Sequence, residues 1–130
     1  MKAAGLVISQ LDGVYAYAKM MNNLDVSYIE PYLADDFQYV SQWVFSEITS
    51  KEAYLDYIRP KLCAIAKSGA GVFAEVASWR GEPCAVVAQG DKGNLVATVL
   101  LKVMDGHISS INMCAVPTPL ETVRSGEYPK

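Results

Sequence analysis

The 130-residue sequence has little of what nucleic-acid-binding and membrane proteins require. Its 11 Lys and Arg residues form no basic run and are outnumbered by 14 Asp and Glu, which argues against nucleic acid and anionic membranes as partners. No apolar run approaches the roughly 18 residues of a membrane span. Gln10 and Asp12 also cut the N-terminal apolar run short of a signal-peptide core.

Cysteine and histidine are also scarce. Cys63, Cys84 and Cys114 are an odd set without a Cys-x-x-Cys pair, so we expect no disulfide framework and a reducing, cytoplasmic location. The one histidine, His107, follows an Asp-Gly turn. Because a zinc site needs three or four ligands, His107 cannot form one alone, and we expect no metal and no cofactor.

The bulk composition is that of a folded domain, with 52% hydrophobic and 19% charged residues. Since neither a repeat nor a linker is visible, residues 1–130 are expected to form a single domain. Apolar residues at helical spacing predict a first helix over residues 11–23. Asp25 can cap a short second helix over residues 26–34, in which Pro31 makes the later turn irregular.

The segment 35–45, DDFQYVSQWVF, reads as a strand. Alternate residues give one strongly aromatic face with a single aliphatic hydroxyl: Phe37, Tyr39, Ser41, Trp43 and Phe45. A long helix follows over residues 49–69, where Thr49 and Glu52 have the spacing of a capping box and Gly69 ends the pattern. Pro60 lies inside that helix and predicts a kink or a split into two helices.

After Gly71 the hydrophobic period changes to two. Four strands are expected, over residues 72–80, 84–89, 95–104 and 107–116, and their short turns make them antiparallel neighbours. The tail, residues 118–130, is expected to be extended. The order α-α-β-α-β-β-β-β predicts an α+β fold with N-terminal helices packed in the concave face of a curved antiparallel sheet.

This order of elements resembles the nuclear transport factor 2-like superfamily, also called the SnoaL-like or cystatin-like α+β cone. Three segments carry the resemblance: NNLDVSYIEPYLADDFQYVS, SEITSKEAYLDYI and MDGHISSINM. Together with the element order, it covers nearly the whole chain. The family includes isomerases, dehydratases, cyclases, epoxide hydrolases and pure binding or assembly modules, so the fold does not select an activity.

In the isomerase branch, the resemblance places Tyr17 at the position of the tyrosine that donates to the oxyanion. It places Ser41 where the proton-shuttling carboxylate would lie, and serine is not basic enough near neutral pH to replace it. Arg80 and Glu75 point to opposite faces of one strand and so do not form an epoxide-hydrolase arrangement. We therefore assign no catalytic residue.

The aromatic face is either plain core or the wall of a cavity. The hydroxyls of Tyr39 and Ser41 favour a cavity, since buried hydroxyls need partners and pockets place a few polar groups among apolar walls. We expect a small hydrophobic or aromatic molecule to bind in an internal cavity lined by Tyr17, Tyr39, Ser41, Trp43, Tyr57, Ile111 and Met113. The alternatives are a SnoaL-like enzyme for a hydrophobic cyclic substrate and an assembly module with a closed core.

The outer face of the sheet is also apolar. In residues 95–103 both alternating sets are mostly hydrophobic, so both faces of that strand need cover. The helices cover one face, and a second subunit is the simplest cover for the other. We therefore expect a homodimer through the outer faces of the sheets. Trp79 fits either the cavity mouth or this contact.

Overall fold

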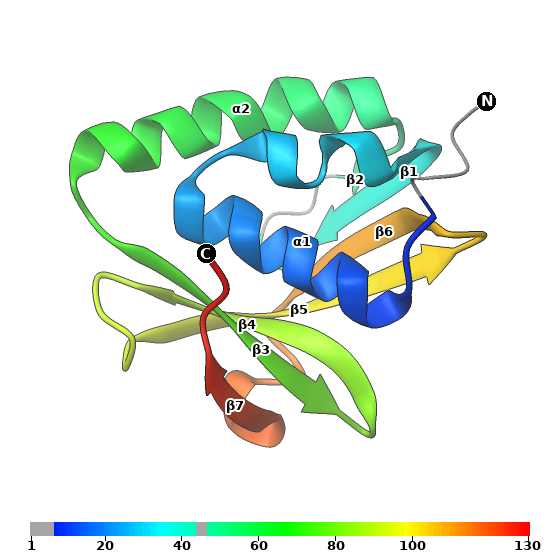
Figure 1. The fold of residues 1–130 in the computed structure, drawn as a ribbon. Helices are drawn as coiled ribbons and strands as arrows, with labels where there is room; N and C mark the ends of the chain where they lie inside the picture. Colours follow the sequence, from blue (N-terminus) through cyan, green and yellow to red (C-terminus); the bar gives the residue numbers. More distant parts are fainter. Residues whose placement is uncertain (1–6, 44–46) are drawn as a thin grey trace.

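The computed structural model describes residues 7–43 and 47–130, and within them a seven-stranded sheet carries α1 (Gln10–Asn23) and α2 (Lys51–Ser68) on one face (Figure 1). The first helix begins at Ser9, whose side chain forms a capping box with Asp12. Gly13 allows close packing on the sheet, because a Cβ there would lie 2.8 Å from Cγ2 of Val103. Helix α1 confirms the first predicted helix.

The second predicted helix, over residues 26–34, is wrong in form. Two single 3₁₀ turns take its place, η2 (Val26–Tyr28) and η3 (Glu30–Tyr32). Asp25 does cap the first of them, accepting a 2.9 Å hydrogen bond from the amide of Ser27. Pro31 lies in the second turn and has no N–H to donate, so a continuous α-helix is disfavoured.

Strand β1 (Leu33–Ser41) begins before the predicted strand over residues 35–45 and ends before it as well. At Ser41 the hydroxyl accepts a 3.2 Å hydrogen bond from the amide of Trp43, and the chain then returns as β2 (Glu47–Ile48), which pairs antiparallel with β1. Trp43 therefore lies beyond the strand, with 60% of its surface exposed. Residues 44 and 45 of the predicted strand lie outside the described residues.

Helix α2 confirms the long predicted helix, with two differences. Ser50, not Thr49, is the N-cap and accepts a 3.1 Å hydrogen bond from the amide of Ala53, because the first helical residue is Lys51. The helix also runs as one element through Pro60 and is not split, up to the left-handed Gly69. After Ile58, Leu62 is the one buried side chain of α2, so the second half of this helix is lightly packed.

The four strands after Gly71 are confirmed as an antiparallel meander: β3 (Val72–Trp79), β4 (Glu82–Gln89), β5 (Leu95–Met104) and β6 (His107–Cys114). The sheet order is β2-β1-β6-β5-β4-β3-β7. Strand β1 runs parallel to β6 and pairs Tyr39 with Ile111, which the antiparallel expectation did not include. The crossover that parallel neighbours require is supplied here by α2 and the meander.

The tail is not a free extended segment. It forms the turn η4 (Pro119–Glu121) and the edge strand β7 (Val123–Glu127), which pairs antiparallel with β3. Figure 1 shows β7, the strand of this C-terminal arm, at the edge of the sheet beside β3, with the C-terminus returning next to α1, where Asn22 donates a 2.7 Å hydrogen bond to the carbonyl of Pro129. The turn η4 packs against β5, and Pro117 and Pro119 are buried there.

The C-terminal arm changes the argument for a dimer. Ala77, Cys84 and Val86 form a small buried cluster beside Trp79 and Leu100, separate from the main core, within a single chain. Part of the outer face is thus already covered without a second subunit. The homodimer stays a prediction, and the apolar side chains it could now use are exposed residues in and just before the arm: Val116, Leu120 and Val123.

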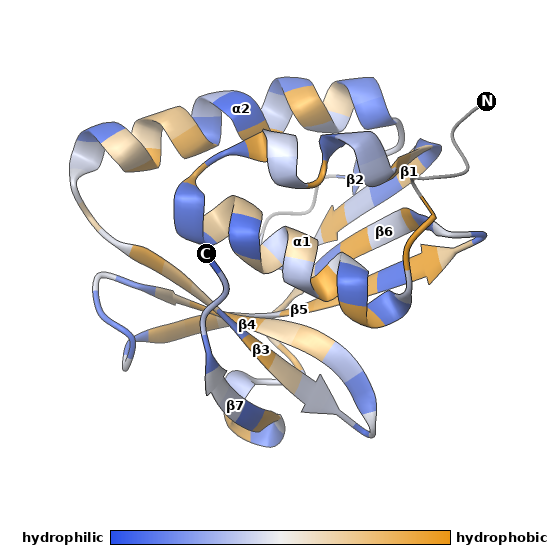
Figure 2. Ribbon diagram, viewed as in Figure 1, coloured by the Kyte–Doolittle hydropathy of each residue, from blue (hydrophilic) through white to orange (hydrophobic). Residues whose placement is uncertain are grey.

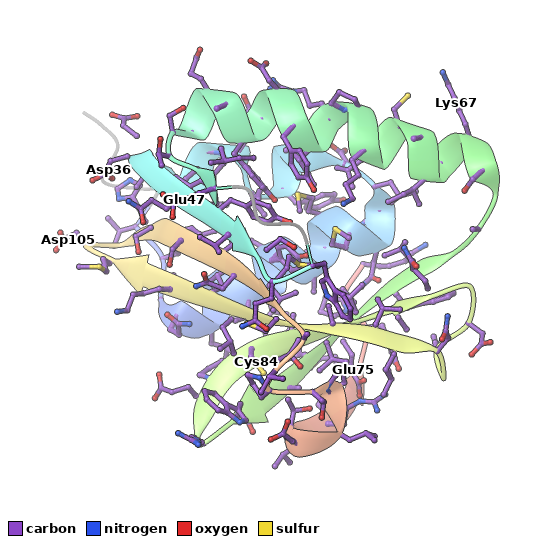
Figure 3. All side chains as sticks on the ribbon, turned by 180° about the vertical axis from the view of Figure 1, so that it is seen from behind. Asp36, Glu47, Lys67, Glu75, Cys84 and Asp105 are labelled. Carbon is purple, nitrogen blue, oxygen red and sulfur yellow. The ribbon has the colours of Figure 1, made fainter. Side chains whose placement is uncertain are left out.

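A buried carboxylate fastens the arm. Glu75 is 2% exposed and accepts hydrogen bonds from Nε of Arg124 and, at 2.7 Å, from the amide of Gly126. Figure 3 shows Glu75 on the side of the sheet where the arm lies. A buried acceptor that loses a charged partner is costly, so this contact should contribute measurably to stability.

Glu75→Gln is expected to lower the free energy of unfolding by about 1.5–3 kcal/mol, because the amide cannot replace the charge-assisted bond to Arg124. Denaturant unfolding measures the loss, and amide hydrogen exchange in residues 123–127 should rise with it. Glu82→Gln, at an exposed position of β4, is the matched control and should change stability by less than about 0.5 kcal/mol. Equal effects of both substitutions would contradict this role.

The main core lies between the two helices and the concave face of the sheet. Figure 2 shows hydrophobic residues along β3 to β6 and hydrophilic ones in the β4–β5 loop. The side chain of Asn22 fixes the end of α1 to β3, bonding the amide of Ala74 at 2.7 Å and its carbonyl at 2.9 Å. Among the described residues, no helix is long and apolar enough to cross a membrane.

Candidate functional site

A small cavity lies inside the cone, between α1, α2 and the β1–β6 pair. Its volume is about 30 Å³, which holds roughly one or two water molecules. Helix α1, strand β1 and helix α2 supply most of its wall, and β6 adds the thioether of Met113. The lining residues are Tyr17, Met21, Tyr39, Tyr54, Ile58, Lys61, Leu62, Ile65 and Met113.

Aromatic rings form the end of this cavity nearest β1. Tyr54 on α2 lies at the centre, with its ring centroid 4.8 Å from Phe37 and 5.3 Å from Tyr39. Tyr57 packs beside them at 5.4 Å from the Tyr39 ring. Tilted pairs at these distances are favourable, so the rings form a rigid wall from two elements.

A row of hydroxyl groups runs along one side of this wall to the helix surface. The hydroxyls of Ser41 and Tyr39 lie near that of Tyr57. Lys61 donates to the same Tyr57 oxygen at 2.9 Å, and its Nζ lies 5.3 Å from the Tyr57 ring centroid. The oxygen of Tyr57 is thus the acceptor of a hydrogen bond from an ammonium group.

The row affects the pKa of its members in opposite directions. Burial acts to raise the pKa of Tyr57, but the hydrogen bonds from Lys61 and Tyr39 and the charge of Lys61 outweigh it and lower that pKa. Burial raises the pKa of Tyr39, and the bond to Tyr57 adds to this. Tyr57 is therefore the most acidic phenol of the cluster and Tyr39 a neutral donor.

The other two phenols are deeply buried. Burial raises the pKa of Tyr17 and that of Tyr54, and the neighbouring tyrosines raise them further. The hydroxyl of Tyr17 lies 3.6 Å from the sulfur of Met113. Both phenols remain protonated near neutral pH and can donate a hydrogen bond inside the cone.

The seven residues expected to line a cavity fall into three groups. Tyr17, Tyr39 and Met113 line the cavity, whereas Ser41 and Tyr57 lie beside Tyr39 and are not among the lining residues. Ile111 is fully buried in the core and does not line this cavity. Trp43 is exposed and does not line this cavity, because the strand ends at Ser41.

Sequence analysis missed several residues of the wall. Tyr54, Ile58, Lys61, Leu62 and Ile65 lie on one face of α2, at spacings of three and four residues. That periodicity predicts a shared helix face. The sequence analysis assigned Tyr57 to the cavity lining and did not assign Tyr54. Lys61 carried no signal in the sequence, since a lysine on an amphipathic helix is ordinarily solvent-exposed.

A larger surface groove of about 560 Å³ lies at the other end of β1, lined by Asp35, Asp36, Asp105 and His107. Nδ1 of His107 is 3.1 Å from the carbonyl oxygen of Asp105, in its own turn. In residues 7–43 and 47–130, no three His, Cys, Asp or Glu side chains gather as a metal site would require. The three cysteines in that part of the chain are free thiols.

The fold of this chain is shared with several solved structures. No protein-family model and no curated protein matches the sequence. An NTF2-like protein of unknown function from Cytophaga hutchinsonii has a TM-score of 0.61 and 17% identity, over 92% of this chain and 98% of its own. A putative polyketide cyclase from Sinorhizobium meliloti has a TM-score of 0.54 and 19% identity, over 76% and 90%.

A third similar structure is an LEH-like epoxide hydrolase from M. tuberculosis, with a TM-score of 0.56 and 18% identity over 80% of this chain and 76% of its own. The chain therefore has the NTF2-like α+β cone fold, as its resemblance to that superfamily predicted. At these identities the similarity extends to the fold, and the activities named for two neighbours belong to those proteins.

Proposed function

We propose that this chain binds a small, flat, mainly apolar molecule inside the cone, against the tyrosine wall. The observation that carries the proposal is the convergence of phenol groups from three elements, α1, β1 and α2, on one cavity. Tyr17, Tyr39 and Tyr54 all line it, and apart from Lys61 the remaining lining side chains are aliphatic or thioether. A few convergent polar groups among apolar walls are typical of ligand pockets.

The cavity must enlarge to admit such a molecule. An engineered cavity of about 150 Å³ accepts benzene, several times the 30 Å³ found here. Two side chains at the boundary, Ile65 and Met113, are only half buried, and methionine adapts readily to new neighbours. The lightly packed second half of α2 can also shift at low cost, since Leu62 is its one buried anchor.

The test is a titration with 2-naphthol, a flat hydroxylated ring, followed by calorimetry and by the melting temperature. The melting temperature should rise with ligand concentration. Tyr17→Phe should weaken binding about five- to tenfold, the value of one neutral hydrogen bond, whereas Tyr28→Phe, at an exposed tyrosine, should not. Met113→Ala should tighten binding because it removes bulk from the wall, and Met104→Ala, at an exposed methionine, is its control.

If neither the natural protein nor Met113→Ala binds, the core is closed and the chain is better described as an assembly module. That alternative is favoured by the small volume of the cavity. A SnoaL-like enzyme is favoured by one other observation, the lowered pKa of Tyr57 beside Lys61, which suits a phenol that exchanges a proton. The free thiols support a cytoplasmic location as part of the same proposal.

A further inference from the structure

Among residues 7–43 and 47–130, the polar groups that line the cavity are hydrogen-bond donors and include no anionic acceptor. Its nine lining residues, all within the described part of the chain, include three phenols and one ammonium group but no carboxylate. Phenols held in the protonated state donate hydrogen bonds, and an ammonium group can only donate. The site therefore offers donors and one positive charge, and it matches a ligand that carries an acceptor or a negative charge.

Lys61 supplies that charge at the edge of the cavity. Its ammonium group lies 2.9 Å from the neutral hydroxyl of Tyr57, and it takes part in neither ion pair found within residues 7–43 and 47–130, Arg59–Glu30 and Arg124–Glu75. The charge of Lys61 is therefore not balanced by a carboxylate in contact with it. Lys61 is solvent-exposed, so an anion would meet this charge at the mouth of the cavity while staying partly hydrated, and the attraction is strongest at low salt.

The oxygen of Tyr57 marks where an acceptor fits. It accepts a 2.9 Å hydrogen bond from Lys61, and the side chains of Lys61 and Tyr39 both line the cavity. A ligand oxygen at the cavity edge meets the same two donors. Charge-assisted hydrogen bonds of this kind are about twice as strong as neutral ones.

We propose that the ligand is an aromatic or polycyclic carboxylate, with its carboxylate bound by Lys61 and Tyr39 and its ring inserted toward Met21 and Met113. The proposal rests on the proposed function, since it names the class of molecule bound at that same site. The ring of Tyr54, which lines the cavity, is the aromatic surface against which the ligand ring packs.

The experiment compares three probes with one ring system: 2-naphthoate, 2-naphthamide and 2-naphthylmethylammonium. Calorimetry at neutral pH and low salt should give an affinity for the carboxylate about tenfold higher than for the amide, and the weakest binding for the cation. Lys61→Met should remove the preference for the carboxylate while leaving amide binding within about twofold. Lys61→Arg should retain it.

Lys67→Met is the matched control, because Lys67 lies on the same helix and points away from the sheet, as Figure 3 shows. Amide binding equal to carboxylate binding, or a preference that survives Lys61→Met, would overturn this inference and leave the proposed function standing. Absence of binding for all three probes would overturn both. Unchanged melting temperatures of the Lys61 variants would exclude misfolding as the cause.

Discussion

Phe37→Ala is expected to lower the free energy of unfolding by about 3–5 kcal/mol, the range for large aromatic deletions in cores. Phe37 is fully buried on the concave face of β1, and its ring contacts that of Tyr54 at a centroid distance of 4.8 Å. The loss combines the transfer free energy of the ring with the cost of the cavity left behind. Tyr54 would also lose one side of its support.

Trp43→Ala is the control for this prediction, since Trp43 is larger than Phe37 but 60% exposed and outside the strand. It should change stability by no more than about 0.5 kcal/mol. Urea unfolding, followed by circular dichroism, measures both variants. Comparable losses from the two substitutions would mean that β1 continues inward past Ser41, against the described geometry.

Above pH 10 the protein is expected to lose stability steeply because of its buried phenols. Burial raises the pKa of Tyr17, Tyr39 and Tyr54 above the ordinary value of 10.0. Below pH 10 both folded and unfolded chains keep these protons, so the contribution to stability is complete. Above it the unfolded chain releases protons that the folded chain retains, at about 1.4 kcal/mol per pH unit for each phenol.

Together the three phenols should cost about 4 kcal/mol at pH 11 relative to neutral pH. Burial and the neighbouring Cys114 also raise the pKa of Cys84, to about 11, which adds a loss that begins near pH 9. Tyr57, with its lowered pKa, acts in the opposite sense below pH 10. Tyr54→Phe isolates one phenol: between neutral pH and pH 11 its unfolding free energy should fall by about 1.4 kcal/mol less than that of the natural protein. Parallel pH curves for the two proteins would contradict the buried state of Tyr54.

Periodic segments of the sequence predicted most of this fold. The alternation in residues 72–116 placed four strands and their antiparallel order, because half-buried strands and short turns leave a strong local signal. The end of β1 was missed, since it depends on the pairing of two residues of β2 with Tyr39 and Val40. Strand β7 was missed for two reasons. Its contacts are distant in sequence, since Glu75 and Arg124 are 49 residues apart, and its residues are all exposed and show no hydrophobic alternation.

The candidate site was predictable where it follows strand alternation. Alternate residues of a strand share a face, so Tyr39 faces inward together with Phe37 and Ser41. Met113 of β6 is the residue that pairs with Ser41 of β1. Lys61 was not predictable from α2 alone. Its hydrogen-bond partner Tyr57 lies four residues earlier, and nothing in the helix shows that Tyr57 packs beside Tyr39 of β1. A charged group on an amphipathic helix becomes part of a site only when the tertiary fold brings acceptors and an apolar opening to it.

The parallel pairing of β1 with β6 has a consequence for how the chain acquires its structure. Strand β1 finds its neighbour in the sheet about seventy residues later, and the side chain of Gln10 bonds the backbone of Val103, 93 residues away. Helix α1 therefore lacks the surface on which it packs until the entire meander has formed. Such nonlocal closure is associated with folding in milliseconds to seconds. Until β5 and β6 arrive, the aromatic face of β1 stays exposed, and this is the stage at which the chain is most prone to self-association.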